Sequence, residues 1–404
     1  MKQIEFDRCS LSELPLRESL AAGLRKDGDF QVLFSQPDLH GPGVEDVLGL
    51  GWRRPDDGHF LGANSLMLPE LWSEGMGPPE PLSLSVMHEA LVFGGLITQR
   101  TESTHREGQA LLRSQGEMTR DSFGYMDGNT TWSADILEQD EHGKSWRYIG
   151  PREASRLQGD YYFVGNVHHH FGHVMLEGLS RLWAMQEVGQ VAPDLRYLVY
   201  ESGLQPFAVQ LLALAGIPED RIVFASPATA VERLFVPSTA MRTHRWITSA
   251  MGDIWGRMVG ACGAPATGAS RKIYLSRRSV GNRPLENEEQ LEELLKSRGF
   301  EIQYPERMSI RDQVRMASEA RVLAGPVGSQ MYLAGFQSPG SAVLVVAPRN
   351  FYLKDDLLLA AAKGHRLAVC FGPSINFREE KSDRHWSVDV SLVSKRLDGL
   401  LEGI

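Results

Sequence analysis

Short runs of apolar, β-branched or aromatic residues alternate with longer segments of helical periodicity from about residue 193 onward. Such runs predict strands at residues 196–200, 222–224, 234–237, 273–275, 300–304, 321–324, 342–346 and 366–370. Apolar residues repeat at helical spacing at residues 204–215, 287–297, 310–320, 329–336, 353–362 and 388–401. Because strands that alternate with helices form parallel sheets covered on both faces, the pattern predicts an α/β fold.

A stretch of small residues rich in Gly and Pro, at 261–270, interrupts this alternation and indicates a linker. We therefore expect an N-terminal domain at residues 1–260 and a C-terminal domain at 271–380, which meet across a cleft. Residues 381–404 add a last helix with one apolar stripe, and we consider a packing of this helix back on the N-terminal domain. Residues 1–150 are rich in turns, and their weak strand signals fit an α/β or a mixed β structure.

Composition and charge narrow the class of protein. Hydrophobic residues make up 42% of the 404 residues and charged residues 23%, as is ordinary for folded soluble proteins. The apolar runs are shorter than the ~18 residues that cross a bilayer, and the N-terminal residues lack the apolar core of a secretory signal. We therefore expect a cytoplasmic protein without an integral membrane segment. The net charge of −9 disfavours binding to nucleic acid. The three Cys residues are far apart in the sequence and suggest neither disulfides nor a thiolate metal site.

The most informative segment is a candidate helix after Gly172, in which a narrow polar stripe faces a wide apolar side. His173, Glu177, Ser180 and Arg181 fall within an arc of about 100° at helical spacing. His173 and Glu177 are four residues apart, so the carboxylate can orient the ring and raise its basicity, as a general base requires. Three interpretations stay open: an active-site stripe, a buried polar network at an interface, and a metal site that uses the neighbouring histidines.

A basic cluster follows the predicted strand 273–275. Arg277, Arg278 and Arg283 leave its carboxyl end, the edge at which ligands bind in open α/β sheets. Guanidinium groups suit phosphate because they stay charged and present paired donors. The alternative is a solvated loop whose arginines pair with the acidic run at 286–293. In that run, Asn287 is placed to cap a helix with an acidic first turn.

A strand, a Gly-rich turn and a helix follow one another at residues 321–336. Backbone N–H groups near Gly328 and Ser329 would then point from a helix N-terminus at a bound anion. The turn is neither a dinucleotide fingerprint nor a Walker loop, which disfavours hydride transfer and P-loop chemistry. Together with the arginines, it suggests a nucleotide diphosphate bound in one domain, with a His-Glu stripe in the other.

These segments resemble glycosyltransferase family 61. The resemblance begins with Phe-Gly-His-Val-Met-Leu-Glu at 171–177 and Leu-Ser-Arg-Leu-Trp at 179–183. It continues in order and spacing through Ile-Tyr-Leu-Ser-Arg at 273–277, Asn287 and Glu288, Gly-Phe-Glu at 299–301, Pro305 and Glu306, Gln313, and the Gly325 to Ser329 turn. Val327, Leu333 and Ser180 stand where many members have His, Asn and Pro.

The resemblance implies a GT-B arrangement of two Rossmann-like domains and an inverting glycosyltransferase that needs no metal or other cofactor. Its expected partners are a nucleotide-sugar donor, with a UDP-sugar favoured, and a glycan or other hydroxyl acceptor, as in bacterial capsular or other surface polysaccharide synthesis. His173 or Glu177 would be the general base. The expected donor-binding residues are Arg277, Arg283, Gly325, Gly328, Ser329 and Gln330. Residues expected on the acceptor side or in support are His170, Arg181, Asn287 and Glu306.

Two alternatives belong to other classes. A metal-dependent hydrolase would use the histidine cluster His168–His173. A protein that binds a nucleotide sugar or glycan without turning it over would explain the departures at Val327 and Leu333.

Overall fold

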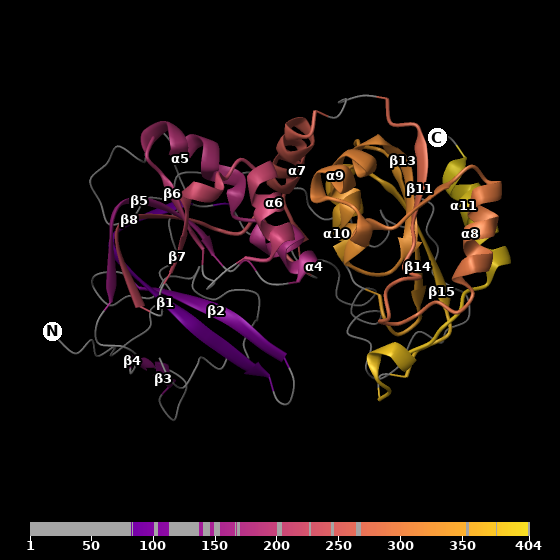
Figure 1. Cartoon of the computed structure of the whole chain (residues 1–404), viewed down its shortest axis with the longest axis horizontal. Coiled ribbons are helices and arrows are strands. Elements are labelled where there is room, and N and C mark those ends of the chain that lie inside the picture. Colours follow the sequence, from indigo (N-terminus) through magenta and orange to yellow (C-terminus); the bar gives the residue numbers. More distant parts are fainter. Residues whose placement is uncertain are drawn as a thin grey trace. The chain divides into compact units, whose positions relative to one another are not determined.

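A computed structural model gives the structure of the chain (Figure 1). It describes residues 82, 84–100, 104–112, 137–139, 146–148, 154–165, 167, 170–199, 204–225, 228–243, 246–263, 268–352, 355–376 and 378–402. The described residues form two compact units, which divide between Arg242 and Thr243. Each unit has its own sheet with parallel strands, so the predicted α/β class with two Rossmann-like units is confirmed.

The sheet of the first unit is mixed. Its strand order is β2 (Thr104–Leu112), β1 (Leu84–Arg100), β8 (Ala228–Pro237), β5 (Ser155–Gly165), β6 (Arg196–Val199) and β7 (Ile222–Phe224). The four strands from β8 to β7 run parallel, whereas β1 is antiparallel to both of its neighbours. Helices α5 (Met185–Val191) and α6 (Pro206–Leu214) connect the parallel strands. This part of the chain therefore combines a Rossmann-like half with an antiparallel hairpin.

The order of these parallel strands reverses beside β5. The chain proceeds from β5 to β6 and β7 on one side, and then returns to place β8 on the other side of β5. In open α/β sheets, ligands bind outside the carboxyl ends of the strands at such a reversal. The segment with His170 and His173 follows the carboxyl end of β5 and thus begins at this position.

Within residues 1–150, the elements that the structure describes are strands. Besides β1 and β2, they are β3 (Leu137–Gln139) and β4 (Trp146–Tyr148), which pair antiparallel. Of the two expectations for this part, its described residues agree with mixed β structure.

The sheet of the second unit is wholly parallel. Its order is β12 (Glu301–Gln303), β11 (Arg271–Leu275), β13 (Ala320–Pro326), β14 (Ala342–Pro348) and β15 (Arg366–Gly372). Helices α8 (Glu288–Ser297) and α11 (Val390–Leu401) cover one face, and α9 (Ile310–Glu319) and α10 (Asp355–Lys363) cover the other (Figure 1). The five strands and these helices coincide, within a few residues, with the elements that the sequence predicts.

Strand order also reverses once in this sheet, between β11 and β13. From β11 the chain passes to β12 on one side and then crosses to β13 on the other. Arg277 follows the carboxyl end of β11, and the Gly328 turn follows that of β13. Both predicted phosphate elements therefore flank the position at which an open sheet of this order binds ligands.

The unit boundary lies earlier than the linker at 261–270. Helix α7 (Ser249–Ala261), which the sequence assigns to the N-terminal domain, belongs to the second unit. Its Trp255 is fully buried and meets Gly335, where an added Cβ would lie 2.9 Å from the ring. The close contact with a residue of the second unit explains why α7 belongs there.

The last helix also differs from expectation. Val393, Leu397 and Leu400 of α11 share a core with Leu291 and Leu295 of α8 and with β14 and β15. The apolar stripe of α11 is thus covered by the sheet of its own unit, not by the N-terminal domain.

Two predicted helices take other forms. Residues Ser329–Phe336 form a 3₁₀ helix, and the glycine at 335 weakens the tendency to form an α-helix. The segment after Gly172 is not continuous, because a π-helical turn at Val174–Gly178 follows the short α-helical turn Phe171–His173, and a 3₁₀ turn follows at Leu182–Ala184.

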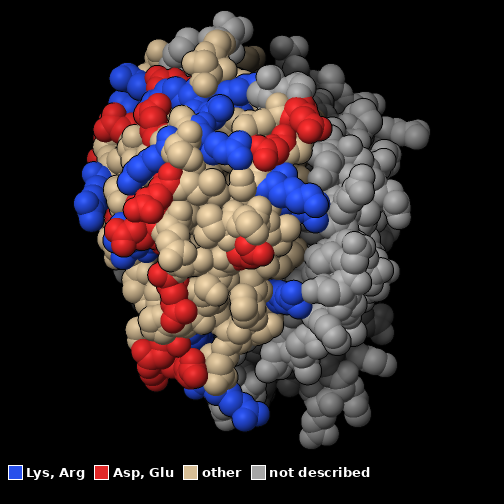
Figure 2. All heavy atoms as spheres, turned by 90° about the vertical axis from the view of Figure 1, so that its right-hand side faces the viewer, with Lys and Arg blue, Asp and Glu red and all other residues tan. Residues whose placement is uncertain are grey.

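On the surface of the second unit, Lys/Arg and Asp/Glu side chains are interspersed (Figure 2). Exposed ion pairs such as Arg278–Glu289 and Arg298–Asp398 account for part of this mixture. Among the residues that the structure describes, no helix is long and apolar enough to cross a membrane.

Candidate functional site

The His173–Glu177 pair is formed in the first unit. Nδ1 of His173 lies 2.9 Å from Oε2 of Glu177, and both side chains are 26% exposed. The ring of His170, which is exposed, packs edge-on against His173 with 5.2 Å between the ring centroids. A carboxylate on Nδ1 fixes the ring and leaves Nε2 as the nitrogen that can exchange a proton with a bound hydroxyl.

The π-helical turn contributes to this geometry. Val174, Met175 and Leu176 are buried at 1% exposure or less, and they anchor the turn in the first unit. Such turns are rare and are found disproportionately at functional sites. The sequence predicts the wide apolar side correctly, but no feature of the residue pattern reveals the change in helix type.

The rest of the predicted polar stripe is interior. Ser180 is fully buried, and its hydroxyl donates to the carbonyl of Glu177 at 2.6 Å. The guanidinium of Arg181 donates to the carbonyl of Pro237 and lies 5.3 Å from the centre of the Phe163 ring. Arg181 therefore joins the ends of β5 and β8 in a structural role, and the stripe divides into a buried half and the accessible His173–Glu177 half.

The histidine cluster is only partly within the described residues, since His168 and His169 lie outside them. Within that described part of the chain, no three His, Cys, Asp or Glu side chains lie close enough to hold a metal ion.

In the second unit, Arg277 spans the strand reversal. Its Nη1 donates to Oε1 of Gln330 at 3.0 Å, and its Nη2 donates to the carbonyl of Asn282 at 3.0 Å. Burial lowers the pKa of Arg277, although nearby Glu288 and Glu306 oppose this effect. Among the described residues, no carboxylate forms an ion pair with Arg277. A partly desolvated guanidinium in this state gains strongly from a bound anion.

Arg283 lies in the same region. Burial, followed by the charges of Arg277 and Arg384, lowers the pKa of Arg283 to about 10. Its guanidinium carbon lies 3.9 Å from the centre of the Phe351 ring, and its backbone has φ of 56°, in the left-handed region. Strained backbone of this kind persists only where the surrounding structure holds it, and it is frequent at ligand sites. The mutual repulsion of these two partly buried cations is relieved by an anion with more than one negative charge.

The Gly-rich turn is shaped by its contact with Arg277. A Cβ on Gly328 would lie 2.3 Å from Nη1 of Arg277 and 2.6 Å from Oε1 of Gln330, so a larger residue would displace the ends of these two side chains. A Cβ on Gly325 would lie 2.8 Å from the sulfur of Met331 and 3.0 Å from the carbonyl of Leu275. Ser329 begins the 3₁₀ helix that follows. The turn thus brings its backbone close to the guanidinium of Arg277.

Arg278 fits the alternative interpretation of the basic cluster, in which arginines of a solvated loop pair with the acidic run at 286–293. It is exposed and pairs with Glu289 at 3.3 Å and with Glu292 at 3.5 Å. Neighbouring residues of one basic cluster therefore have different environments, Arg278 exposed on the surface and Arg277 partly buried at the strand reversal.

Two supporting residues have other contacts than predicted. Asn287 stands at the start of α8 without capping it, since its amide instead exchanges two hydrogen bonds with the backbone of Val388, at 2.7 and 3.1 Å. Glu306 accepts a hydrogen bond from the hydroxyl of Ser279. By contrast, the hydroxyl of Ser309 caps α9, accepting from the N–H of Asp312 at 3.1 Å.

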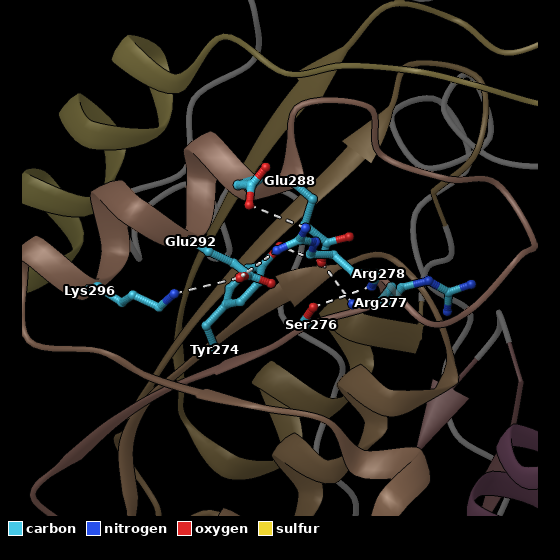
Figure 3. A network of polar contacts seen from close by, with 8 residues as sticks. Tyr274, Ser276, Arg277, Arg278, Glu288, Glu292 and Lys296 are labelled. Carbon is cyan, nitrogen blue, oxygen red and sulfur yellow. Dashed lines mark hydrogen bonds and ion pairs between the residues drawn. The ribbon is translucent and has the colours of Figure 1, made fainter.

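Sequence reasoning missed three residues of this region: Phe351, Arg384 and the buried Glu288. Phe351 comes three residues after the end of β14, so the rule that found Arg277 could have found it. Arg384 and Glu288 are placed by long-range packing, which residue spacing does not show. Figure 3 shows Glu288 together with Tyr274, Arg277 and Glu292.

Comparisons with solved structures give weak likenesses. An E. coli heptosyltransferase, WaaC, with ADP is 11% identical over 59% of this chain and 99% of its own, with a TM-score of 0.31. The iron-containing dodecameric glycosyltransferase TibC from enterotoxigenic E. coli is 10% identical over 69% of this chain and 81% of its own, with a TM-score of 0.27. TM-scores this low support no conclusion about this chain, and a search of curated proteins found no match.

The comparison with protein families is informative. The family described as Glycosyltransferase 61 matches residues 171–344. The match begins at Phe171, directly before the His173–Glu177 pair, and continues through Arg277 and the Gly328 turn into β14. Over these residues the chain is similar to glycosyltransferase family 61.

Proposed function

We propose that this protein is a glycosyltransferase. It moves a glycosyl group from a nucleoside diphosphate sugar, with a UDP-sugar as the favoured donor, to a hydroxyl acceptor. The observation that carries the proposal is the partly buried guanidinium of Arg277 beside Gly328 at the strand reversal of the second unit. In the proposed reaction, Arg277, Arg283 and the backbone N–H groups at Gly328 and Ser329 stabilise charge that develops on the leaving diphosphate. Gln330 supports Arg277 through its side-chain oxygen.

We propose His173 as the general base. Its Nδ1 is held by Glu177, so Nε2 takes the proton from the acceptor hydroxyl while the oxygen attacks the anomeric carbon. The bond from that carbon to the diphosphate oxygen breaks as the new glycosidic bond forms, and a single displacement inverts the anomeric configuration. Glu177 is the alternative base if His173 serves only to position the acceptor.

No metal ion is needed in this proposal, because the arginines supply the positive charge at the leaving group. The proposed setting is synthesis of surface polysaccharide or another glycan, in the cytoplasm. This setting comes from the resemblance to family 61.

The test is a transfer assay with a panel of UDP-, GDP-, dTDP- and CDP-sugars and simple glycoside acceptors, in the presence and absence of EDTA. We expect EDTA-insensitive product whose anomeric proton coupling shows the configuration opposite to that of the donor. Retained configuration would contradict the single displacement, and loss of activity with EDTA would contradict metal independence. Nucleotide binding without transfer to any acceptor would instead favour the non-catalytic alternative.

A further inference from the structure

Glu288, the first residue of α8, is an acid that is only 2% exposed. Figure 3 shows its side chain directed back toward the end of β11. Its Oε1 accepts a hydrogen bond from the hydroxyl of Tyr274 at 3.0 Å and another from the backbone N–H of Arg277 at 2.7 Å. We call these two hydrogen bonds the Glu288 bridge.

The Glu288 bridge closes a loop. Residues 278–287 leave the strand after Arg277 and return at the start of α8, so one carboxylate oxygen joins the two ends of the loop. The loop carries Arg283, and the carbonyl of its Asn282 accepts from Nη2 of Arg277. Joining the ends reduces the conformations open to both arginines before any ligand binds.

The C-terminal segment holds the same loop from another side. Asn287 bonds the backbone of Val388, and Nε1 of Trp386 donates to the carbonyl of Arg283 at 3.1 Å. The adjacent residues Asn287 and Glu288 therefore fix the loop in two directions, one toward the C-terminal segment and one toward β11.

Helix stability alone does not account for Glu288. An exposed acid in the first turn, such as Glu289, interacts favourably with the helix dipole at little cost. Burial raises the pKa of Glu288, which means that the fold bears a cost to keep this carboxylate inside. That cost is expected where the group has a local role besides stabilising the helix.

We propose that Glu288 is a positioning residue, an inference that rests on the function proposed above. It holds the loop at residues 277–287, which we call the Arg277 loop, in the conformation that binds the donor diphosphate. Glu288 acts through the backbone of Arg277 and does not itself contact the donor. This role requires a hydrogen-bond acceptor oxygen as far from the backbone as Oε1 of a glutamate, whether or not the group is charged.

The test uses two substitutions that separate the effect of side-chain length from the effect of charge. Glu288→Gln keeps an oxygen at the same distance, whereas Glu288→Asp keeps the charge but withdraws the oxygen by one methylene. Glu289→Gln and Glu289→Asp are matched controls, because Glu289 is the next residue and is exposed. Affinity is measured for UDP and for pyrophosphate, which needs no base or sugar contacts.

We expect Glu288→Asp to weaken both ligands about tenfold, because a displaced Arg277 loses about the value of one charged hydrogen bond to the diphosphate. Glu288→Gln and the two controls should stay within about threefold of the wild type. In a double-mutant cycle, Glu288→Asp should add less than about twofold to Arg277→Ala, because it acts through Arg277. A weakened Gln variant beside an unaffected Asp variant, or additive losses in the cycle, would overturn the proposal.

Amide hydrogen exchange at Arg277 gives a readout that requires no ligand. This N–H should exchange slowly in the wild type and in Glu288→Gln, and faster in Glu288→Asp. Faster exchange with unchanged affinity would leave Glu288 a purely structural residue and overturn the inference alone. A wild type that binds neither UDP nor pyrophosphate would overturn the donor site, and this inference with it.

Discussion

The His173–Glu177 pair and the Arg277 loop occupy corresponding places in two sheets, but they are built differently. Each follows the carboxyl end of a strand at which the strand order reverses. The first is about one quarter exposed and lies on short turns of α- and π-helix. The second is partly buried, and hydrogen bonds tie Arg277 to Glu288 of α8, to Gln330 and to the carbonyl of Asn282.

This difference suits two tasks. A group that exchanges a proton with an incoming hydroxyl must be reachable, and it needs orientation more than burial. Groups that bind a phosphate gain strength when they are fixed and desolvated beforehand, because the interaction then requires no rearrangement. The comparison leads to the division of roles tested below, with chemistry at His173 and binding at Arg277.

The largest expected effect is on turnover. His173→Ala should lower the rate of transfer by about 10²- to 10⁴-fold, the usual contribution of a general base. Affinity for UDP should stay within about twofold of the wild type, as followed by calorimetry. A matched loss in affinity would mean that the two regions do not have separate roles.

The next effect concerns binding. Arg277→Ala should weaken UDP by about 10- to 100-fold, since it removes charged hydrogen bonds to the diphosphate. Its neighbour Arg278 is exposed, so Arg278→Ala should leave the affinity nearly unchanged. Equal effects of the two substitutions would place the phosphate elsewhere.

A smaller effect comes from shape alone. Gly328→Ala introduces a Cβ at 2.3 Å from Nη1 of Arg277, which must move away. We expect about tenfold weaker UDP binding, measured by the same titration. Gly281→Ala is the control, because a Cβ there meets nothing within 4 Å. Unchanged binding in Gly328→Ala would show that the Arg277 position is not critical.

The smallest effect concerns stability outside both regions. Burial lowers the pKa of His365 to about 4, against an ordinary value of 6.5. Its neutral form is therefore favoured by folding, and the associated stability is present above about pH 6.5 and lost as the pH falls toward 4. The loss is on the order of 2 to 3 kcal/mol.

Denaturant unfolding between pH 7 and pH 4 measures this dependence. His365→Gln should flatten it, whereas His88→Gln, at an exposed position, should not. An unchanged slope in His365→Gln would contradict the assignment to His365.

Local signals predicted most elements of the second unit, because apolar strands, helical periodicity and the Ser309 cap all act over a few residues. The same signals singled out Arg277, Gly328 and the His173–Glu177 pair as candidate site residues. They could not assign α7 and α11 to a unit. An apolar helix side could pack on either unit, and only the long-range contacts determine which one. They also gave Asn287 and Glu288 the local roles of a helix start, whereas contacts with Val388 and Arg277 determine their real positions.

The central claim is that the second unit binds a diphosphate at Arg277 and Arg283. The most direct measurement is a thermal-shift titration of the wild type with UDP, pyrophosphate and uridine, since a ligand of the native state raises the midpoint with concentration. We predict that UDP and pyrophosphate raise the midpoint, and that uridine does so weakly or not at all. A shift by uridine equal to that by UDP, with none by pyrophosphate, would contradict the claim.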